Sequence, residues 1–107
     1  MKLAAQHLAV LIDRDDVCIV DVRSAAEYRD DGHLPGAINI PVQTILAHVA
    51  SLAGYASIAC ICATGTRSKS AVRLLRSVGI AHAYDVVGGY AAWHEAKCVV
   101  SPRVVPA

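Results

Sequence analysis

The sequence has almost no net charge and no long apolar run. Ten Lys and Arg residues stand against nine Asp and Glu residues, which leaves a formal net charge of +1 at pH 7. Domains that bind nucleic acid or anionic membranes carry a clear basic excess, so we expect neither partner. No apolar stretch reaches the roughly 18 residues that a membrane-spanning helix needs. The sequence therefore gives no indication of a function in binding nucleic acids or membranes.

Metal-binding patterns, repeats and linkers are absent as well. The four cysteines form no C-x-x-C pair and the five histidines are scattered, so we expect neither a metal site nor a cofactor. Residues 1–107 are predicted to form one domain that buries about 60–70% of its unfolded surface. Residues 101–107, which contain two prolines, are predicted to be an extended tail. No apolar stripe exceeds the needs of one core, so a monomer or a weak homodimer is expected.

The N-terminal residues 3–12 are mostly apolar, but Gln6 and His7 interrupt them. A charged segment follows at 13–16 without a cleavage-like site, so an amphipathic helix is favoured over a signal peptide. Reduced thiols without an export signal are typical of the cytoplasm, and we expect a cytoplasmic protein.

Helical and strand patterns alternate along the chain. Apolar periodicity predicts helices at 2–12, 25–31, 42–52, 68–78 and 90–95, and strands at 17–20, 38–40, 57–61 and 83–87. This alternation predicts an α/β fold with a mostly parallel central sheet of about four to five strands and helices on both faces. Ligands bind at the carboxyl ends of the strands in such sheets.

A cysteine stands at one of these strand ends. Cys62 follows the apolar run 57–61 and precedes the helix predicted at 68–78. Backbone N–H groups of a tight loop and of a first helical turn form an anion receptor, which favours thiolate over thiol. Arg67 adds a full positive charge nearby, so Cys62 is a candidate nucleophile. The alternative is a buried cysteine that acts only as a small apolar residue.

Three separated blocks of the sequence agree with one protein family. The first covers residues 19–24, 27–28 and 32–41 (IVDVRS, EY and GHLPGAINIP), the second covers 62–68 (CATGTRS), and the third covers 87–90 (VGGY) and runs on to Trp93. The blocks stand in the family's order and, with their spacers, span most of the chain. The sequence therefore resembles a single-domain rhodanese.

This resemblance implies a rhodanese-type sulfurtransferase of the thiosulfate sulfurtransferase class. Cys62 would attack the outer sulfur of thiosulfate, a polysulfide or a low-molecular-weight or protein persulfide, and would carry it as a persulfide. Cyanide or a thiol would then remove it, and two such half-reactions predict ping-pong kinetics. The loop N–H groups would wrap the outer sulfur, while the Arg67 guanidinium would hold the loop or an anionic donor. The substrate-binding residues that the resemblance implies are Ala63, Thr64, Gly65, Thr66 and Arg67.

Two other functions are alternatives to this one. Cysteine-dependent phosphatases and arsenate reductases separate their cysteine from their arginine by five residues, whereas four separate Cys62 from Arg67 and six separate Cys60 from it. The shorter loop suits sulfur better than a phosphoryl group. A rhodanese-like module that only binds a partner or senses sulfur is the other alternative, and the retained cysteine favours the enzyme.

The residue after the nucleophile bears on the donor. Family members that use thiosulfate well often have a second basic residue there, whereas this chain has Ala63. A dianionic donor gains less electrostatic steering from one arginine than from two. Lys69 and Arg73 on the following helix compensate only in part, so modest thiosulfate activity is expected.

Four residues are predicted to support the site without reacting: Asp21, Arg23, His33 and Ser68. An ion pair or a backbone bond is expected for Asp21 and Arg23, and a backbone bond for His33. Ser24 and Glu27 have capping-box spacing, which gives the helix at 25–31 its start.

The remaining cysteines and aromatic residues are assigned mainly to structure. Cys60 shares a strand face with Cys62 and is either a resolving thiol or, as we favour, a buried apolar residue. Cys18 is assigned to the core, and Cys98 is expected to be exposed. Trp93 is predicted to anchor the core, and Tyr90 to line the mouth of the pocket.

Overall fold

Five parallel strands form the centre of the molecule. The computed structural model describes residues 1–96, and the strand order of its sheet is β1-β5-β4-β2-β3. The strands are β1 (Lys2–Leu3), β2 (Val17–Asp21), β3 (Ile38–Asn39), β4 (Ser57–Ile61) and β5 (Ala83–Val86). The middle strand, β4, pairs in parallel with β2 and with β5. Its carboxyl end therefore lies between the ends of two neighbouring strands.

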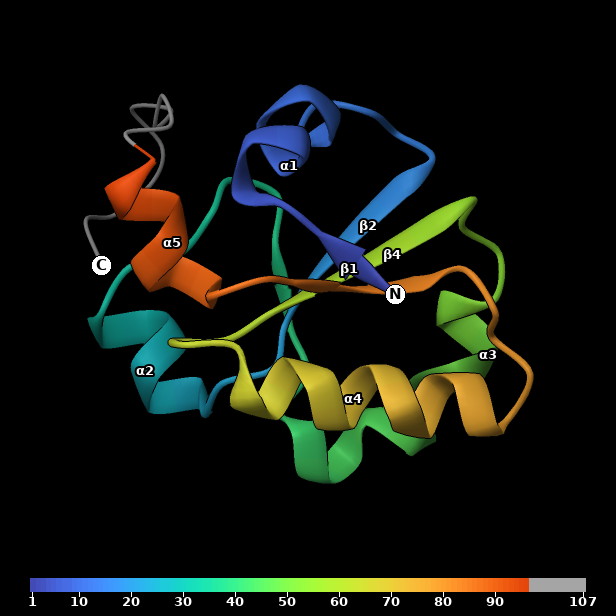
Figure 1. Ribbon diagram of the computed structural model, residues 1–107. Helices are drawn as coiled ribbons and strands as arrows, with labels where there is room; N and C mark the ends of the chain where they lie inside the picture. The colour runs from blue at the N-terminus through green and yellow to red at the C-terminus, as the bar shows by residue number, and fades with distance from the viewer. Residues whose placement is uncertain (97–107) are drawn as a thin grey trace.

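Helices cover both faces of this sheet. They are α1 (Ala5–Leu11), α2 (Ala25–Asp30), the 3-10 helix η1 (Val42–His48), α3 (Val49–Leu52), α4 (Thr66–Ser77) and α5 (Gly89–Glu95). Figure 1 shows α1 and α5 on one side of the sheet, and α4, η1 and α3 on the other. The predicted α/β fold with a parallel sheet is confirmed.

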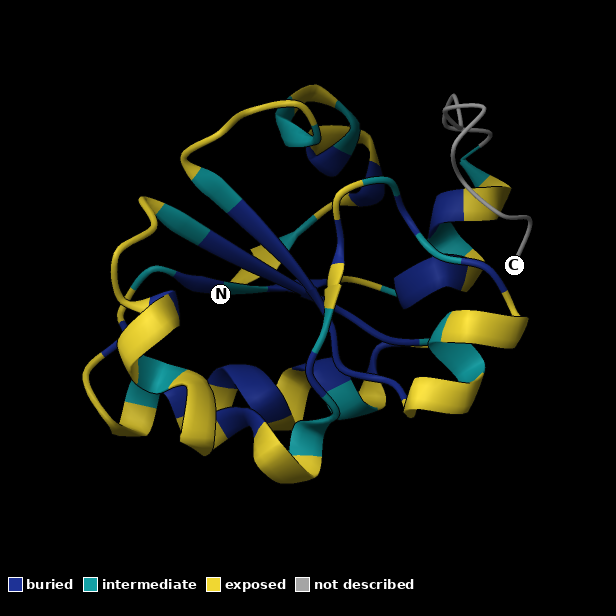
Figure 2. Cartoon of the chain, turned by 180° about the vertical axis from the view of Figure 1, so that it is seen from behind, coloured by how far each residue is buried: buried dark blue, intermediate teal, exposed yellow. Residues whose placement is uncertain are grey.

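Each face of the sheet has its own apolar core. Because side chains alternate along a strand, Ile58 and Cys60 of β4 pack on the α4 face, while Ala59 and Ile61 pack on the α1 and α5 face. Figure 2 shows the central strands buried along most of their length, with the exposed residues mainly on the helices and loops. Trp93 is buried in the α5 core, which confirms its predicted place as an anchor.

The prediction of one helix over residues 2–12 is wrong at its start. Lys2 and Leu3 form the edge strand β1, which pairs with Asp85 and Val86 of β5, and the helix begins only at Ala5. These pairs join residues more than 80 positions apart in the sequence. Local periodicity contains no information about such a pairing, so the apolar pattern predicts only a helix.

The segment predicted as one helix over 42–52 consists of two pieces. A 3-10 helix covers Val42–His48 and a short α-helix covers Val49–Leu52. In a 3-10 helix residues three apart lie on one side, and Val42 and Ile45 pack together against the core in this way. The other predicted helices and strands differ from the observed ones by at most two residues at an end.

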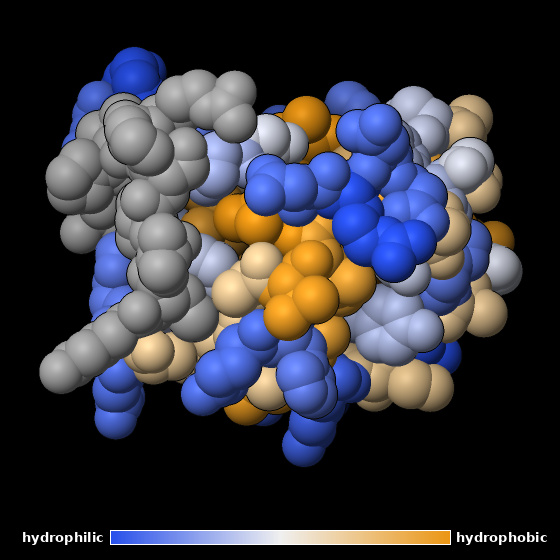
Figure 3. Space-filling view, turned by 90° about the horizontal axis from the view of Figure 1, so that it is seen from above, coloured by the Kyte–Doolittle hydropathy of each residue, from blue (hydrophilic) through white to orange (hydrophobic). Residues whose placement is uncertain are grey.

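The surface is mixed in polarity. Viewed from above, the face that carries α1 shows apolar atoms at its centre with charged side chains beside them (Figure 3), and Val10 of α1 is 78% exposed. Within residues 1–96, no helix has the length and apolar character needed to cross a membrane. Cys98 and the predicted tail at 101–107 lie outside the described residues.

Candidate active site

Cys62 lies at the carboxyl end of β4, between that strand and α4. Its side chain is buried, with 1% of the residue exposed. The backbone N–H of Gly65 donates to its Sγ at 3.0 Å, and the N–H of Ser68 in the first turn of α4 donates at 3.4 Å. Gly65 adopts φ +101°, a left-handed conformation that glycine reaches at low cost. The loop thus turns its amides toward the sulfur, an arrangement that stabilises negative charge there.

The carbonyl groups of the same loop are bound from the other side by α5. The N–H of Tyr90 donates to the Cys62 carbonyl at 2.9 Å, and the N–H of Ala91 donates to the Ala63 carbonyl at 3.1 Å. A β-carbon at Gly89, which has φ +59°, would overlap the Cys62 carbonyl oxygen. The Gly-Gly turn before α5 therefore allows the close approach that fixes the loop.

The rest of the loop presents mainly backbone to a ligand. Thr64 and Thr66 are exposed and Ala63 is half-buried. Within the described part of the chain, the side chains of these three residues form no hydrogen bond that orients them. Any contribution of residues 63–66 to binding would come chiefly from their amides.

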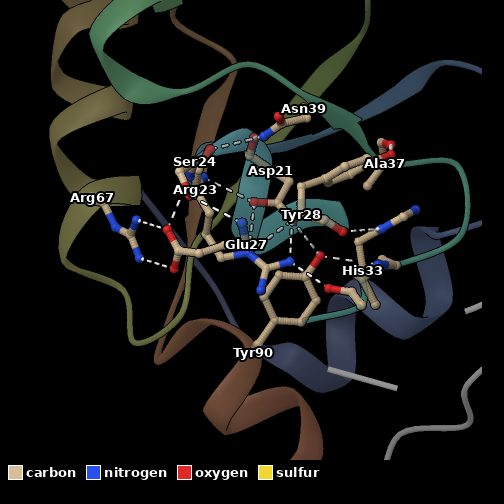
Figure 4. Close-up of polar contacts among 12 residues, drawn as sticks. Asp21, Arg23, Ser24, Glu27, Tyr28, His33, Ala37, Asn39, Arg67 and Tyr90 are labelled. Carbon is tan, nitrogen blue, oxygen red and sulfur yellow. Dashed lines mark hydrogen bonds and ion pairs between the residues drawn. The ribbon is translucent and has the colours of Figure 1, made fainter. Parts of the chain in front are cut away.

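The Arg67 side chain contacts α2 instead of the sulfur. Its Nη1 and Nη2 donate to the two carboxylate oxygens of Glu27 at 2.6 and 3.0 Å (Figure 4). The hydrogen bonds from Arg67 are the main cause that lowers the pKa of Glu27 to about 2, against an opposing effect of burial. Glu27 and Ser24 also form the expected capping box. The sequence predicts the cap and places Glu27 in the first family block, but it does not predict the pairing of Glu27 with Arg67.

A buried ion pair lies beside the loop. Asp21 at the end of β2 accepts hydrogen bonds from Nε of Arg23 at 3.0 Å and from its Nη2 at 2.8 Å, which confirms the predicted pair. The Tyr90 hydroxyl donates to Asp21 at 2.9 Å, and the Tyr90 ring lies 4.1 Å from the Arg23 guanidinium carbon (Figure 4). Burial, with the charge of Asp21, raises the pKa of Tyr90, which keeps this donor protonated. Tyr90 is thus buried, and its predicted place at the pocket mouth is wrong.

The turn that follows α2 is tied to the same cluster. Arg23 Nη2 donates to the Gly32 carbonyl at 2.6 Å. Nδ1 of His33 lies 2.7 Å from the Tyr28 carbonyl, and the two rings stack with centroids 3.7 Å apart. The backbone bond expected for His33 is therefore present. These contacts hold the His33 ring against Tyr28 of α2.

Ser68 connects Cys62 to a second buried carboxylate. The Ser68 hydroxyl donates to Oδ1 of Asp85 on β5 and lies 3.4 Å from the Cys62 sulfur, whose S–H can donate to it. Ser68 and Asp85 are both buried. Sequence reasoning did not select Asp85, although it is the only charged residue in the strand predicted at 83–87.

The other described cysteines, Cys18 and Cys60, belong to the core. Burial raises the pKa of Cys60 to about 12, and the nearby Asp85 charge acts in the same direction. Cys60 is therefore a thiol at neutral pH, which disfavours a role as a resolving nucleophile.

Comparison with known proteins agrees with the three sequence blocks. The family model described as the rhodanese-like domain matches residues 4–96. A thiosulfate sulfurtransferase from Shewanella oneidensis, GlpE, is 28% identical over 95 residues, which are 89% of this chain and 93% of that protein.

Solved structures give the same picture. A rhodanese-related protein from Thermoplasma volcanium superposes with a TM-score of 0.80 at 30% identity, covering 99% of this chain and 98% of that one. The human single-domain sulfurtransferase TSTD1 superposes with a TM-score of 0.75 at 29% identity, covering 88% and 95%. From its sequence blocks, its parallel sheet and the cysteine loop between β4 and α4, this chain belongs to the rhodanese-like domain family.

Proposed function

We propose that this protein is a sulfurtransferase that carries sulfane sulfur as a persulfide on Cys62. The observation that carries the proposal is the pair of backbone N–H bonds to the Cys62 sulfur, from Gly65 and Ser68, at the N-terminus of the 12-residue helix α4. Relatives named thiosulfate sulfurtransferase support the same reaction class.

The reaction proceeds in two displacement steps. With thiosulfate, the Cys62 thiolate attacks the outer sulfur, a new S–S bond forms, the S–S bond of the donor breaks, and sulfite leaves with the electron pair. In the second step cyanide or a thiolate attacks the outer persulfide sulfur, and the electron pair of the broken bond returns to Cys62. Both enzyme forms are anions, so the amide receptor of the loop stabilises either one.

Charge at the loop favours a persulfide group, which carries at most one negative charge, over the dianion thiosulfate. Arg67 is engaged through both terminal nitrogens by Glu27, and the residue after the nucleophile is Ala63. The dianion thiosulfate gains most from an unpaired cation and finds none on residues 62–66. A small persulfide or the persulfide of a partner protein fits this pocket better. The reaction needs a compartment that keeps Cys62 reduced, such as the cytoplasm.

The test is mass spectrometry of the intact protein after brief exposure to thiosulfate or to polysulfide, with peptide mapping. We expect one added sulfur atom on Cys62 with at least one of the two donors, and its removal by cyanide. Cys62→Ser should form no adduct. Cys60→Ala is the matched control, because Cys60 lies two residues earlier on the same face of the sheet, and it should form the adduct normally.

Two outcomes would contradict the proposal. Persulfide formation by Cys62→Ser would show that another residue is the nucleophile. No adduct with either donor, in folded protein whose Cys62 is reduced, would favour a module that binds a partner or senses sulfur without turnover.

A further inference from the structure

The proposed reaction requires a Cys62 thiolate, and forming that thiolate requires a group that accepts the thiol proton. The nearest group that can take part is the Ser68 hydroxyl, whose oxygen lies 3.4 Å from the Cys62 sulfur. That hydroxyl has one proton and two acceptors within reach, Oδ1 of Asp85 and the Gly65 carbonyl at 3.2 Å. The three side chains form a continuous path from the sulfur to a buried carboxylate.

The Asp85 carboxylate has one hydrogen-bond partner and no ion-pair partner among residues 1–96. Its Oδ1 accepts the Ser68 hydroxyl, whereas its Oδ2 is buried and has no hydrogen-bond partner among residues 1–96. The ion pairs of this part of the chain are Arg14–Asp16, Arg23–Asp21, Arg29–Asp30 and Arg67–Glu27, so Asp85 belongs to none of them. Burying an ionised carboxylate without such partners costs free energy, and protonation removes that cost.

The Cys62 sulfur has more hydrogen-bond donors facing it than the Asp85 carboxylate has. It accepts two backbone N–H groups and lies at the positive end of α4, while Asp85 accepts a single hydroxyl. We propose that Asp85 takes the proton of Cys62 through Ser68. The S–H proton passes to the Ser68 oxygen as the Ser68 hydroxyl proton passes to Oδ1 of Asp85, and the charge moves from Asp85 to the sulfur. The buried cluster carries one negative charge before and after.

The new arrangement reverses the direction of each hydrogen bond. Protonated Asp85 donates to the Ser68 oxygen, and the Ser68 hydroxyl donates to the Cys62 sulfur as its third donor. Because the persulfide formed on Cys62 is also an anion, Asp85 keeps this proton through both half-reactions. Asp85 thus acts through Ser68 and touches no substrate.

Other titratable groups face Asp85 from three elements. Cys60 pairs with it across the sheet, but its raised pKa keeps it a thiol, so it does not compete as a proton acceptor. A groove of about 360 Å³ reaches Asp85 from the surface, and its charged lining comes from Met1, β1 and α4. The cationic groups of this lining are the α-amino group of Met1 and the side chains of Lys2, Lys69, Arg73 and Arg76. They lie beyond ion-pair distance of Asp85, and added salt should weaken what influence they have.

The test is the pH dependence of Cys62 alkylation by iodoacetamide, followed by peptide mapping. This inference rests on the proposed nucleophile, but alkylation reports the thiolate whether or not sulfur is transferred, so the two proposals can fail separately. In the native protein the proton stays inside the cluster, so the alkylation rate should be nearly constant between about pH 6 and 8. In Asp85→Asn the proton must go to water, and the rate should rise about tenfold per pH unit below its midpoint.

Ser68→Ala interrupts the path without altering the carboxylate, so it should reproduce the pH profile of Asp85→Asn. If Asp85→Asn does not fold, the profile of Ser68→Ala tests the proposal in its place. Ser70→Ala, at an exposed position on the same helix, is the matched control and should keep the native profile. Equal profiles in Asp85→Asn and the native protein would overturn the proposal. So would faster alkylation of Asp85→Asn at every pH, which is the result expected if Asp85 only repels the thiolate.

Discussion

Asp21 and Asp85 are two buried carboxylates with different surroundings on opposite faces of the sheet. Asp21 lies on the α5 side, is 0% exposed, and accepts hydrogen bonds from the Arg23 guanidinium, the Arg23 backbone and the Tyr90 hydroxyl. Asp85 lies on the α4 side, is 3% exposed, and accepts one hydroxyl. A buried carboxylate that is paired and fully hydrogen-bonded is held in its ionised state. Asp21 is thus fixed by an ion pair and by several hydrogen bonds, whereas the Ser68 hydroxyl is the single hydrogen-bond partner of the Asp85 carboxylate among residues 1–96.

The sharpest test of this difference compares the same substitution at both positions. Asp21→Asn removes the charge opposite Arg23 and leaves a buried cation uncompensated, so the free energy of unfolding should fall by about 3–5 kcal/mol. Asp85→Asn isolates no cation and should cost about 1 kcal/mol or less. Urea denaturation of both variants measures the two losses. Equal losses would mean that the two carboxylates are held alike.

Removing the Tyr90 hydroxyl, which donates to Asp21, should lower the free energy of unfolding by a smaller amount. Tyr90→Phe deprives both the Leu34 N–H and the Asp21 carboxylate of a partner, so unfolding should become easier by about 1–3 kcal/mol. Tyr55→Phe is the matched control: this residue is 38% exposed, its hydroxyl forms no hydrogen bond within residues 1–96, and it should change stability by less than about 0.5 kcal/mol. A Tyr90→Phe variant as stable as this control would show that Asp21 does not need its third partner.

The smallest effect concerns the partly exposed carboxylate of Glu27, which is paired like Asp21 but reaches solvent. Its pKa is lowered to about 2 in the folded protein, so its stabilising effect is complete above its ordinary value and is lost as pH falls toward 2. Glu27→Gln should therefore destabilise the protein by about 1 kcal/mol or less at neutral pH. Urea midpoints of both proteins, measured over a pH series, should converge below about pH 4. A difference that persists or grows in acid would contradict this account.

The features of this fold that the sequence predicts are those formed by residues close to one another in the sequence. The Ser24–Glu27 capping box, the apolar runs of β2 and β4, and the glycine at the start of α4 each act on neighbouring residues, and each could be predicted from spacing alone. The position of Cys62 after a buried strand followed for the same reason. Local signals also placed its loop at the carboxyl edge of the sheet.

The missed features all depend on residues far apart in the sequence. β1 forms because Lys2 and Leu3 pair with β5. Arg67 of α4 pairs with Glu27 of α2, and the Ser68 hydroxyl of α4 donates a hydrogen bond to Asp85 of β5. Which of two possible partners a side chain binds depends on which of them lies closer to it in the folded protein. Sequence spacing contains no information about that distance. Arg67, with its charge next to the loop in the sequence, is the clearest example.

The sequence by itself determined the alternation of strands and helices, the strand end that carries Cys62, and the family to which the chain belongs, because periodicity, caps and motif spacing are local properties. The tertiary structure alone decided which buried carboxylate is paired, where the Arg67 charge is directed, and that a path of hydrogen bonds leads from Cys62 through Ser68 to Asp85. Those outcomes depend on desolvation and on distances of a few ångströms between side chains from separate elements, which exist only once the chain has folded.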